Sequence, residues 1–203
     1  TTGNNNVAVG HDALNDLTTA TGNTAVGSMA SDQITTGNNN TAVGNYANTS
    51  CTTGYSNVSI GLQAHNAGTT HSNNTAVGFN SASTGTTGYN NAALGHNAAT
   101  LATTADSYVA VGQNTLAALT TGTGNTGCGS MAGYDCTTGT TNTFLGRLAG
   151  YQSTTTGSNN TMVGHYAVAP SVSADNTFTL GNSSVDNLRC NDTSISSLSD
   201  ERD

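Results

Sequence analysis

One residue pattern returns along most of the chain at a fixed interval of seventeen residues, and this period limits the folds open to it. Each copy reads approximately N-T-A-V-G-x-x-A-x-x-x-x-T-T-G-x-x. The eleven glycines that mark the copies are Gly10, Gly27, Gly44, Gly61, Gly78, Gly95, Gly112, Gly129, Gly146, Gly164 and Gly181, with a single eighteen-residue step before Gly164. A short fixed period is the signature of a repeat architecture, in which each unit stacks on its neighbours.

The residues before each glycine predict a short β-strand. They alternate and are often β-branched, so the positions one and three before the glycine share one face. The glycine then permits a turn with positive φ, and T-T-G-x-N predicts a second corner. Asn stands four residues before the glycine in nine copies. We expect these asparagines to form an internal hydrogen-bonded ladder.

The residue directly before each glycine is expected to form the core of the stack, because it is almost always a large aliphatic side chain. These residues, called the Val column below, are Val9, Val26, Val43, Ile60, Val77, Leu94, Val111, Cys128, Leu145, Val163 and Leu180. A single seventeen-residue unit buries too little surface to fold alone, so stability must come from stacking coil on coil.

Together these features predict an all-β fold: a repetitive β-solenoid or β-roll of seventeen-residue coils. A helical repeat does not fit, because Thr, Asn and Gly supply 90 of the 203 residues and are poor helix formers. Leucine-rich repeats need about 20–29 residues per unit. Eleven coils at about 4.8 Å each would form a rod about 50 Å long. We expect residues 1–181 to form this shaft and residues 182–203 to form an irregular C-terminal segment.

Charge and hydropathy exclude two classes of partner. The net charge is −8, with eleven acids, three arginines and no lysine. A nucleic-acid partner is not expected, because binding phosphates needs a basic patch. Membrane insertion is not expected either, because no run approaches the roughly 18–20 apolar residues that span a bilayer. The chain starts inside a repeat unit, so we expect further sequence before Thr1.

The histidines do not predict a metal site. His11, His96 and His165 share the position after the repeat glycine, but they fall in coils that are not adjacent. His65 and His71 are expected at different corners. Exposed histidines are therefore favoured, although a threefold axis could gather three copies of one histidine around zinc or another metal that accepts imidazole.

The cysteines are expected to be free thiols, which fits assembly in a reducing cytoplasm. Cys128 occupies the Val column and is interpreted as a small buried hydrophobe. Cys51 and Cys136 share one column but lie five coils apart, about 24 Å at the strand spacing, whereas a disulfide needs Cα atoms within about 7 Å. Cys190 lies beyond the repeats.

Enzymatic chemistry is not expected, and no cofactor or metal is predicted. The acids are scattered, no carboxylate pair is indicated, and no repeat column places a His–Asp pair beside a serine. Tyrosines near the corners are interpreted as fillers between chains. The aspartates and tyrosines considered were Asp12, Asp16, Asp32, Asp106, Asp135, Asp175, Tyr46, Tyr55, Tyr89, Tyr134, Tyr151 and Tyr166.

Two features resemble known families. The N-T-A-V-G-x-x-A unit resembles the head repeats of trimeric autotransporter adhesins and the shafts of phage tail fibres, over about residues 1–181. Ser199-Asp200-Glu201-Arg202 is similar to the S-D-x-R motif that opens the self-cleaving intramolecular chaperone of phage tail fibres and spikes. The resemblance implies a homotrimeric fibre, processing at Ser199 with Asp200 and Arg202 in the motif, and a chaperone domain that would follow residues 182–203 and is absent from this chain.

The expected function is therefore structural: the shaft of a bacteriophage tail fibre or appendage that supports host attachment, located on the extracellular virion. Expected partners are two further copies of the chain and other virion tail proteins, with a host-surface glycan left open. One alternative is the head of a bacterial trimeric adhesin on the cell surface. Another is a Thr-rich ice-binding β-solenoid, although adjacent threonines differ from the T-x-T arrays of such proteins.

Overall fold

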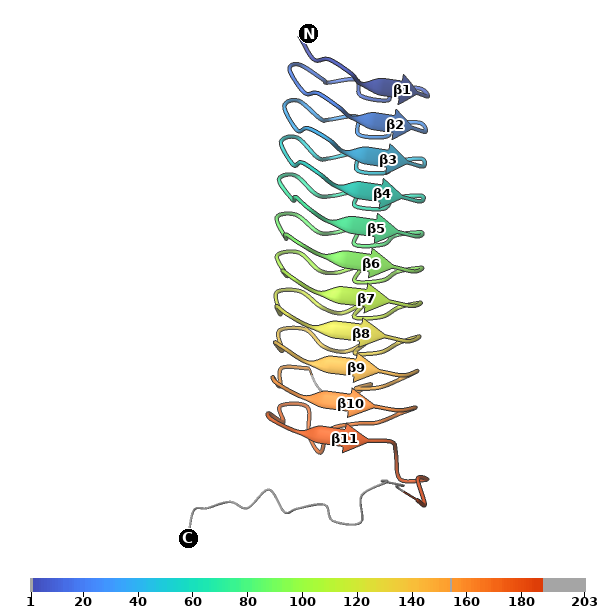
Figure 1. Cartoon of the computed structure of the whole chain (residues 1–203), viewed down its shortest axis with the longest axis vertical. Helices are drawn as coiled ribbons and strands as arrows, with labels where there is room; N and C mark the ends of the chain where they lie inside the picture. The colour runs from blue at the N-terminus through green and yellow to red at the C-terminus, as the bar shows by residue number, and fades with distance from the viewer. Residues whose placement is uncertain (1, 154, 188–203) are drawn as a thin grey trace.

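The computed structural model describes residues 2–153 and 155–187, which form an all-β solenoid without a helix (Figure 1). Each coil contributes one strand of three residues. The strands are β1 (Val7–Val9), β2 (Thr24–Val26), β3 (Thr41–Val43), β4 (Val58–Ile60), β5 (Thr75–Val77), β6 (Ala92–Leu94), β7 (Val109–Val111), β8 (Thr126–Cys128), β9 (Thr143–Leu145), β10 (Thr161–Val163) and β11 (Phe178–Leu180). The predicted fold class is confirmed.

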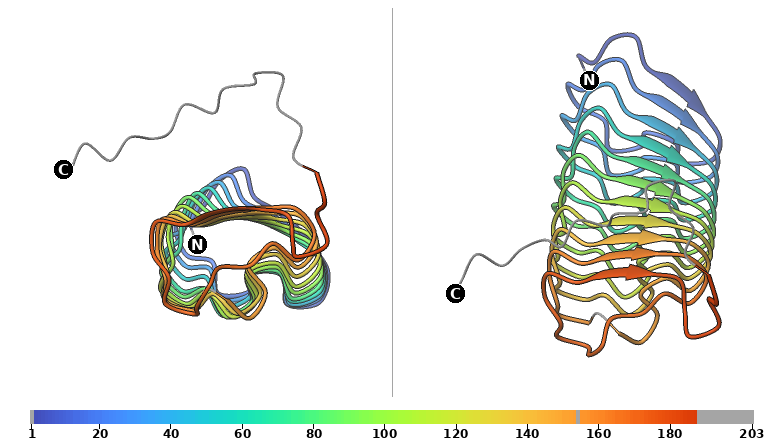
Figure 2. Two further views of the ribbon diagram at one scale, coloured as in Figure 1. Left: turned by 90° about the horizontal axis from the view of Figure 1, so that it is seen from below. Right: turned by 60° about the horizontal axis from the view of Figure 1, so that its bottom comes forward.

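The eleven strands form one parallel sheet in chain order, β1 to β11. Val7 pairs with Thr24 and Thr24 with Thr41, so each residue lies beside its equivalent seventeen positions later. The step from β9 to β10 pairs Thr143 with Thr161, eighteen positions apart. Viewed along the rod, the coils lie one over another and enclose a common interior (Figure 2). Every column of the repeat is therefore a physical row along the rod.

The corners of each coil depend on left-handed backbone. Two residues after the repeat glycine, four after it and twelve after it, φ lies near +50 to +60° in most coils, as at Asn97, Ala99 and Asn90. The repeat glycine itself needs a larger positive angle, such as +144° at Gly95. A Cβ built on Gly95 would lie 2.4 Å from the carbonyl oxygen of Gly112 in the next coil. Close stacking of the coils therefore requires glycine at this position.

The interior is lined by small residues, and this corrects the prediction for the Val column. The middle residue of each strand from β2 to β10 is buried, as Ala25, Ala42 and Ala93 are with no exposed surface. Most of the Val column points outward instead: Val9, Val26, Val43, Ile60, Leu94, Val111, Cys128, Leu145 and Leu180 are exposed, and Val77 and Val163 are half-buried. A seventeen-residue coil is too narrow to hold a second branched side chain in every layer, so available volume overrides hydrophobicity.

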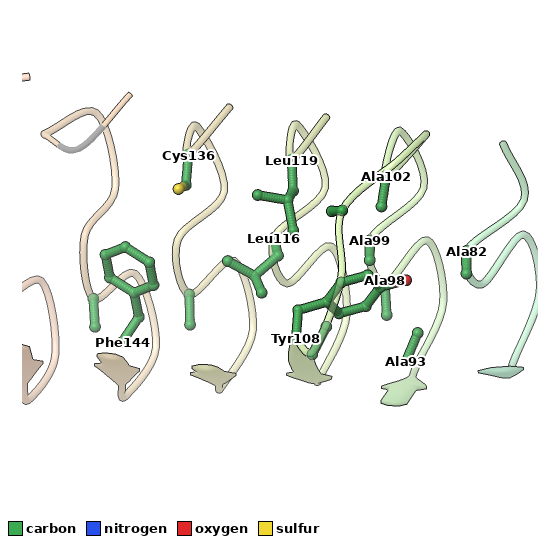
Figure 3. Packing of buried hydrophobic residues seen from close by; sticks show 14 of the residues in the cluster. Ala82, Ala93, Ala98, Ala99, Ala102, Tyr108, Leu116, Leu119, Cys136 and Phe144 are labelled. Atoms are coloured by element: carbon green, nitrogen blue, oxygen red, sulfur yellow. The ribbon is translucent and has the colours of Figure 1, made fainter. Parts of the chain in front are cut away.

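Larger side chains enter the interior only where neighbouring coils make room. Phe144 is fully buried in the middle of β9. A Cβ at Gly133 or Gly150 would lie 2.5 or 2.2 Å from its ring, so these glycines supply the space. Figure 3 shows Phe144, Leu116 and Tyr108 extending into the interior, with alanines such as Ala93 and Ala99 in neighbouring coils. A large side chain in one coil fills the space that glycines leave in the neighbouring coils, and this keeps the packing dense.

The asparagines before each strand form the expected ladder. The amide oxygen of Asn142 accepts hydrogen bonds from the backbone N–H and the side-chain amide of Asn160, both at 3.0 Å. Its amide nitrogen donates to the carbonyl of Gly157 at 2.8 Å and to the oxygen of Asn125 at 3.1 Å. Similar bonds join most other pairs of successive asparagines. The ladder satisfies polar backbone groups that the narrow interior hides from water.

Replacing Asn142 with alanine is expected to lower the free energy of unfolding by about 2–3 kcal/mol, since it leaves several buried polar groups without a partner. The exposed Asn45, replaced in the same way, is the matched control and should change stability by less than about 0.5 kcal/mol. Thermal and urea unfolding of both variants measures the difference. Equal stability of the two variants would mean that the ladder contributes nothing.

Candidate functional site

The outward side of the sheet is the most regular surface of the described chain. It is formed by the first and third residues of every strand and is called the sheet face below. The third residue is the Val column, for example Val43 with 37% and Leu145 with 47% of its surface exposed. The first residue is most often a half-buried threonine, as in Thr41 and Thr75. Stacking places like residues above one another at about 4.8 Å.

All 22 positions of the sheet face are uncharged, in a chain with a net charge of −8. The face consists of Val, Ile, Leu, Thr, Ala, Phe and one Cys. Isolated exposed apolar residues are normal on protein surfaces, but a continuous apolar surface indicates an interaction site. The sheet face can contact another surface without burying an unpaired charge.

Three cysteines are described, and all are free. Cys128 was predicted to be buried, but it is exposed on the sheet face because it follows the Val column outward. Cys51 and Cys136 are buried, and burial raises their thiol pKa to about 11 and about 12. Only the thiolate is a good nucleophile. Among these three, Cys128 is therefore the thiol available for reaction.

His65 and His71 were expected at different, exposed corners, and this prediction was wrong. Both side chains are buried, and their rings meet inside the coil with centroids 4.5 Å apart. Nδ1 of His65 lies 3.1 Å from the hydroxyl of Ser59, whereas neither ring nitrogen of His71 has a hydrogen-bond partner. Burial lowers the pKa of His71 to about 4, and burial together with His71 lowers that of His65 well below its usual value. Both imidazoles are therefore neutral near pH 7.

The other histidines lie on the surface, each with a different neighbour. His11 contacts the carboxylate of Asp12 at 2.9 Å, His96 stacks on Phe79 with ring centroids 5.2 Å apart, and His165 lies 3.1 Å from Arg147. Across residues 2–153 and 155–187, His, Cys, Asp and Glu side chains do not gather in threes around a potential metal position.

The acids are less scattered than the sequence indicated. Asp16 and Asp32 lie in adjacent coils, and the backbone N–H of Asp16 donates to the carbonyl of Asp32 at 2.9 Å. Partial burial raises the pKa of Asp32, and the nearby charges of Asp16 and Asp12 raise it further. One carboxylate oxygen of Asp32 has no hydrogen-bond partner. This geometry shows repulsion between like charges.

The threonine pairs occupy a bend rather than a strand, with the first threonine half-buried and the second exposed, as at Thr35 and Thr36. The first threonine of each pair donates its hydroxyl to the backbone of the next coil, as Thr35 does to Thr52 at 3.0 Å. The second, such as Thr36, is exposed. The first row therefore stabilises stacking, and the second forms a line of hydroxyl groups along the rod.

Ser199, Asp200 and Arg202, the predicted processing residues, lie outside the described residues, and so does Cys190. Processing at Ser199 stays a prediction. Within the described part of the chain, no helix has the length and apolar character needed to cross a membrane.

Fold and surface together define a class of molecule: a repeat protein with a parallel β-solenoid fold and one uncharged, largely apolar face. Comparison with known proteins adds no narrower identity. No family model, no curated protein and no solved structure matches the chain.

Proposed function

We propose that the chain is a structural fibre segment whose sheet face packs against two further copies, making the trimeric shaft of a bacteriophage tail fibre or related virion appendage. The observation that carries the proposal is the continuous uncharged row of the Val column. Side chains such as Ile60 and Leu94 point away from the interior, yet aliphatic residues recur in the Val column in coil after coil. An interface between chains gives these side chains the burial that the single coil denies them.

Mechanical stiffness follows from the same repetition. Each coil is joined to the next by strand pairing, the Asn ladder and the first threonine row, so bending the rod strains many bonds together. The work of such a segment is to hold a host-recognising tip at a distance from the virion. The head of a bacterial trimeric adhesin would use the same assembly on a cell surface.

Crosslinking through Cys128 tests this arrangement. In a Cys190→Ser variant, the Cys128 thiols lie close together inside a trimer whose sheet faces surround one axis. Oxidation with copper phenanthroline should then join pairs of chains through Cys128 into a disulfide-linked species of about 40.4 kDa, twice 20.2 kDa. The matched control carries Cys128→Ser, Cys190→Ser and Thr121→Cys, which moves the thiol to the exposed threonine row and should give far less product. Equal crosslinking of both variants would contradict an interface on the sheet face.

A second candidate, ice binding, uses the same face without a trimer. Six strands begin with Thr and most end with an aliphatic residue, as in β2, β3 and β5, so methyl and hydroxyl groups form a regular array. Such an array repeats at the strand spacing. A folded monomer that produces thermal hysteresis would favour this function over the fibre, and a trimer without hysteresis would exclude it.

A further inference from the structure

Three tyrosines from successive coils form a row near the C-terminal end of the solenoid. The ring centroids of Tyr134 and Tyr151 are 5.9 Å apart, and those of Tyr151 and Tyr166 are 6.3 Å apart. Tyr166 is exposed, and the other two are half-buried. The sequence did not indicate this row, because Tyr166 follows its repeat glycine by two residues and the others by five. The intervening turn brings these two positions together.

Three asparagines lie beside one end of the row. Asn80, Asn97 and Asn114 occupy one column in three adjacent coils, and they line an open hollow of about 340 Å³ together with Thr100, Leu101, Ala117 and Tyr134. No side-chain hydrogen bond within the chain engages the amides of these three described residues. The six residues Asn80, Asn97, Asn114, Tyr134, Tyr151 and Tyr166 are called the Asn–Tyr track below.

The other end of the track opens into a second hollow. It measures about 380 Å³ and is lined by Tyr166, Val168, Thr179, Leu180, Gly181, Asn182 and Ser183. Tyr134 and Tyr166, the two ends of the tyrosine row, thus each line a hollow, and Tyr151 lies between them. The amides, the aromatic rings and both hollows follow one line along the rod.

The backbone does not require these residue types. The asparagine column is left-handed, with φ of 52 to 54° at the three asparagines, but Met131, Leu148 and Tyr166 adopt the same conformation at equivalent positions. The column of Tyr134 holds Ala117 and Thr100 in the preceding coils. The amides and the rings therefore need another explanation than turn geometry.

We propose that the Asn–Tyr track binds an uncharged oligosaccharide that runs along the rod. Pyranose rings present C–H faces that pack on aromatic rings and hydroxyl edges that bond to amides, and the track offers both groups side by side. No charged side chain lines either hollow, which favours a neutral glycan over an acidic one. Successive coils repeat at about 4.8 Å, close to the length of one sugar unit in an extended chain.

A polypeptide partner fits this surface less well. The backbone groups around the track already bond to adjacent coils, as the N–H of Ala118 does to the carbonyl of Tyr134 at 3.0 Å. An added strand would find few free donors and acceptors there. The six residues of the track lie outside the sheet face, and only Leu180, at the edge of the second hollow, belongs to both surfaces.

Calorimetric titration with cellohexaose, mannohexaose and chitohexaose tests the proposal, with polysialic acid as the charged comparison. At least one neutral hexasaccharide should bind saturably. Tyr151→Ala should weaken that binding about tenfold, and Asn97→Ala about fivefold. Tyr89→Ala, at an exposed tyrosine on another corner, is the matched control and should leave affinity unchanged. Circular dichroism of each variant confirms that it is folded.

Three results would overturn the proposal: no binding of any of the three neutral sugars up to millimolar concentration, preference for polysialic acid, or equal losses in Tyr89→Ala and Tyr151→Ala. Solution mass measured on the same samples separates this test from that of the fibre. A trimer that binds no sugar contradicts the track alone, and a monomer that binds through Tyr151 contradicts the fibre alone.

Discussion

Replacing Gly95 with alanine is expected to lower the free energy of unfolding by about 4 kcal/mol, the largest effect of any single substitution considered. Two causes add. The backbone angle φ of +144° is strained for any residue with a Cβ, and the new methyl carbon would lie 2.4 Å from the carbonyl oxygen of Gly112. The contact is with backbone, so no side-chain rotation relieves it, and the two coils must separate locally.

Gly124→Asn is the matched control for this prediction. Gly124 has φ of +69°, and a Cβ there meets no atom closer than 3.3 Å. Asparagines such as Asn73 and Asn90 occupy the same column with φ near 60°. This variant should therefore keep or slightly raise stability. Thermal unfolding followed by circular dichroism compares the two, and a Gly95→Ala protein as stable as Gly124→Asn would refute the close stacking of the coils.

Acid should destabilise the solenoid strongly through His65 and His71. The folded state holds both rings neutral, whereas the unfolded chain protonates them near pH 6.5. Stability is therefore complete above about pH 6.5 and falls as the pH drops below it, until the folded pKa values are passed. For His71, with a folded pKa of about 4, the loss amounts to about 3 kcal/mol, and His65 adds to it.

The surroundings offer no compensation for this proton uptake. The Cys51 thiol in the preceding coil is neutral, because its pKa is raised to about 11, and the described aspartates lie in other coils. His65→Leu combined with His71→Ala should flatten the decline between pH 6.5 and 4, because Leu116 and Ala105 fill the same columns elsewhere. His96→Ala, at an exposed ring, is the control. The free energy of unfolding, measured with urea at several pH values in this range, tests the prediction. If it falls as steeply with pH in the double variant as in the unaltered protein, the two histidines do not cause the decline.

Much of the fold could be predicted because the fixed period places each residue beside its equivalent in the next coil. The coil length, the place of each strand and the Asn ladder all follow from spacing. Which strand face turns inward was predicted wrongly, since Val outranks Ala in hydrophobicity but does not fit the narrow interior. One signal was present: the middle strand position holds Ala, Ser or Gly from Ala25 to Gly127, and such uniform smallness indicates a tightly enclosed position.

Contacts across the interior could not be predicted from spacing along one coil. His65 and His71 meet because the coil closes on itself, and the volume they need is supplied by glycine: a Cβ at Gly68 would lie 2.0 Å from Nδ1 of His71. The tyrosine row escaped notice for a related reason, because a tight turn joins positions that differ by three in sequence. Positions that repeat every seventeen residues predict contacts between adjacent coils. The contacts of His65 with His71 and of Tyr151 with Tyr166 instead join different positions of the repeat, so the period does not reveal them.

Solution mass by sedimentation equilibrium tests the fibre assembly most directly. The account predicts a folded, β-rich species of about 60.6 kDa, three times the chain mass of 20.2 kDa. A folded monomer of 20.2 kDa that remains monomeric on concentration would contradict it, since the sheet face would then have no second copy to cover it.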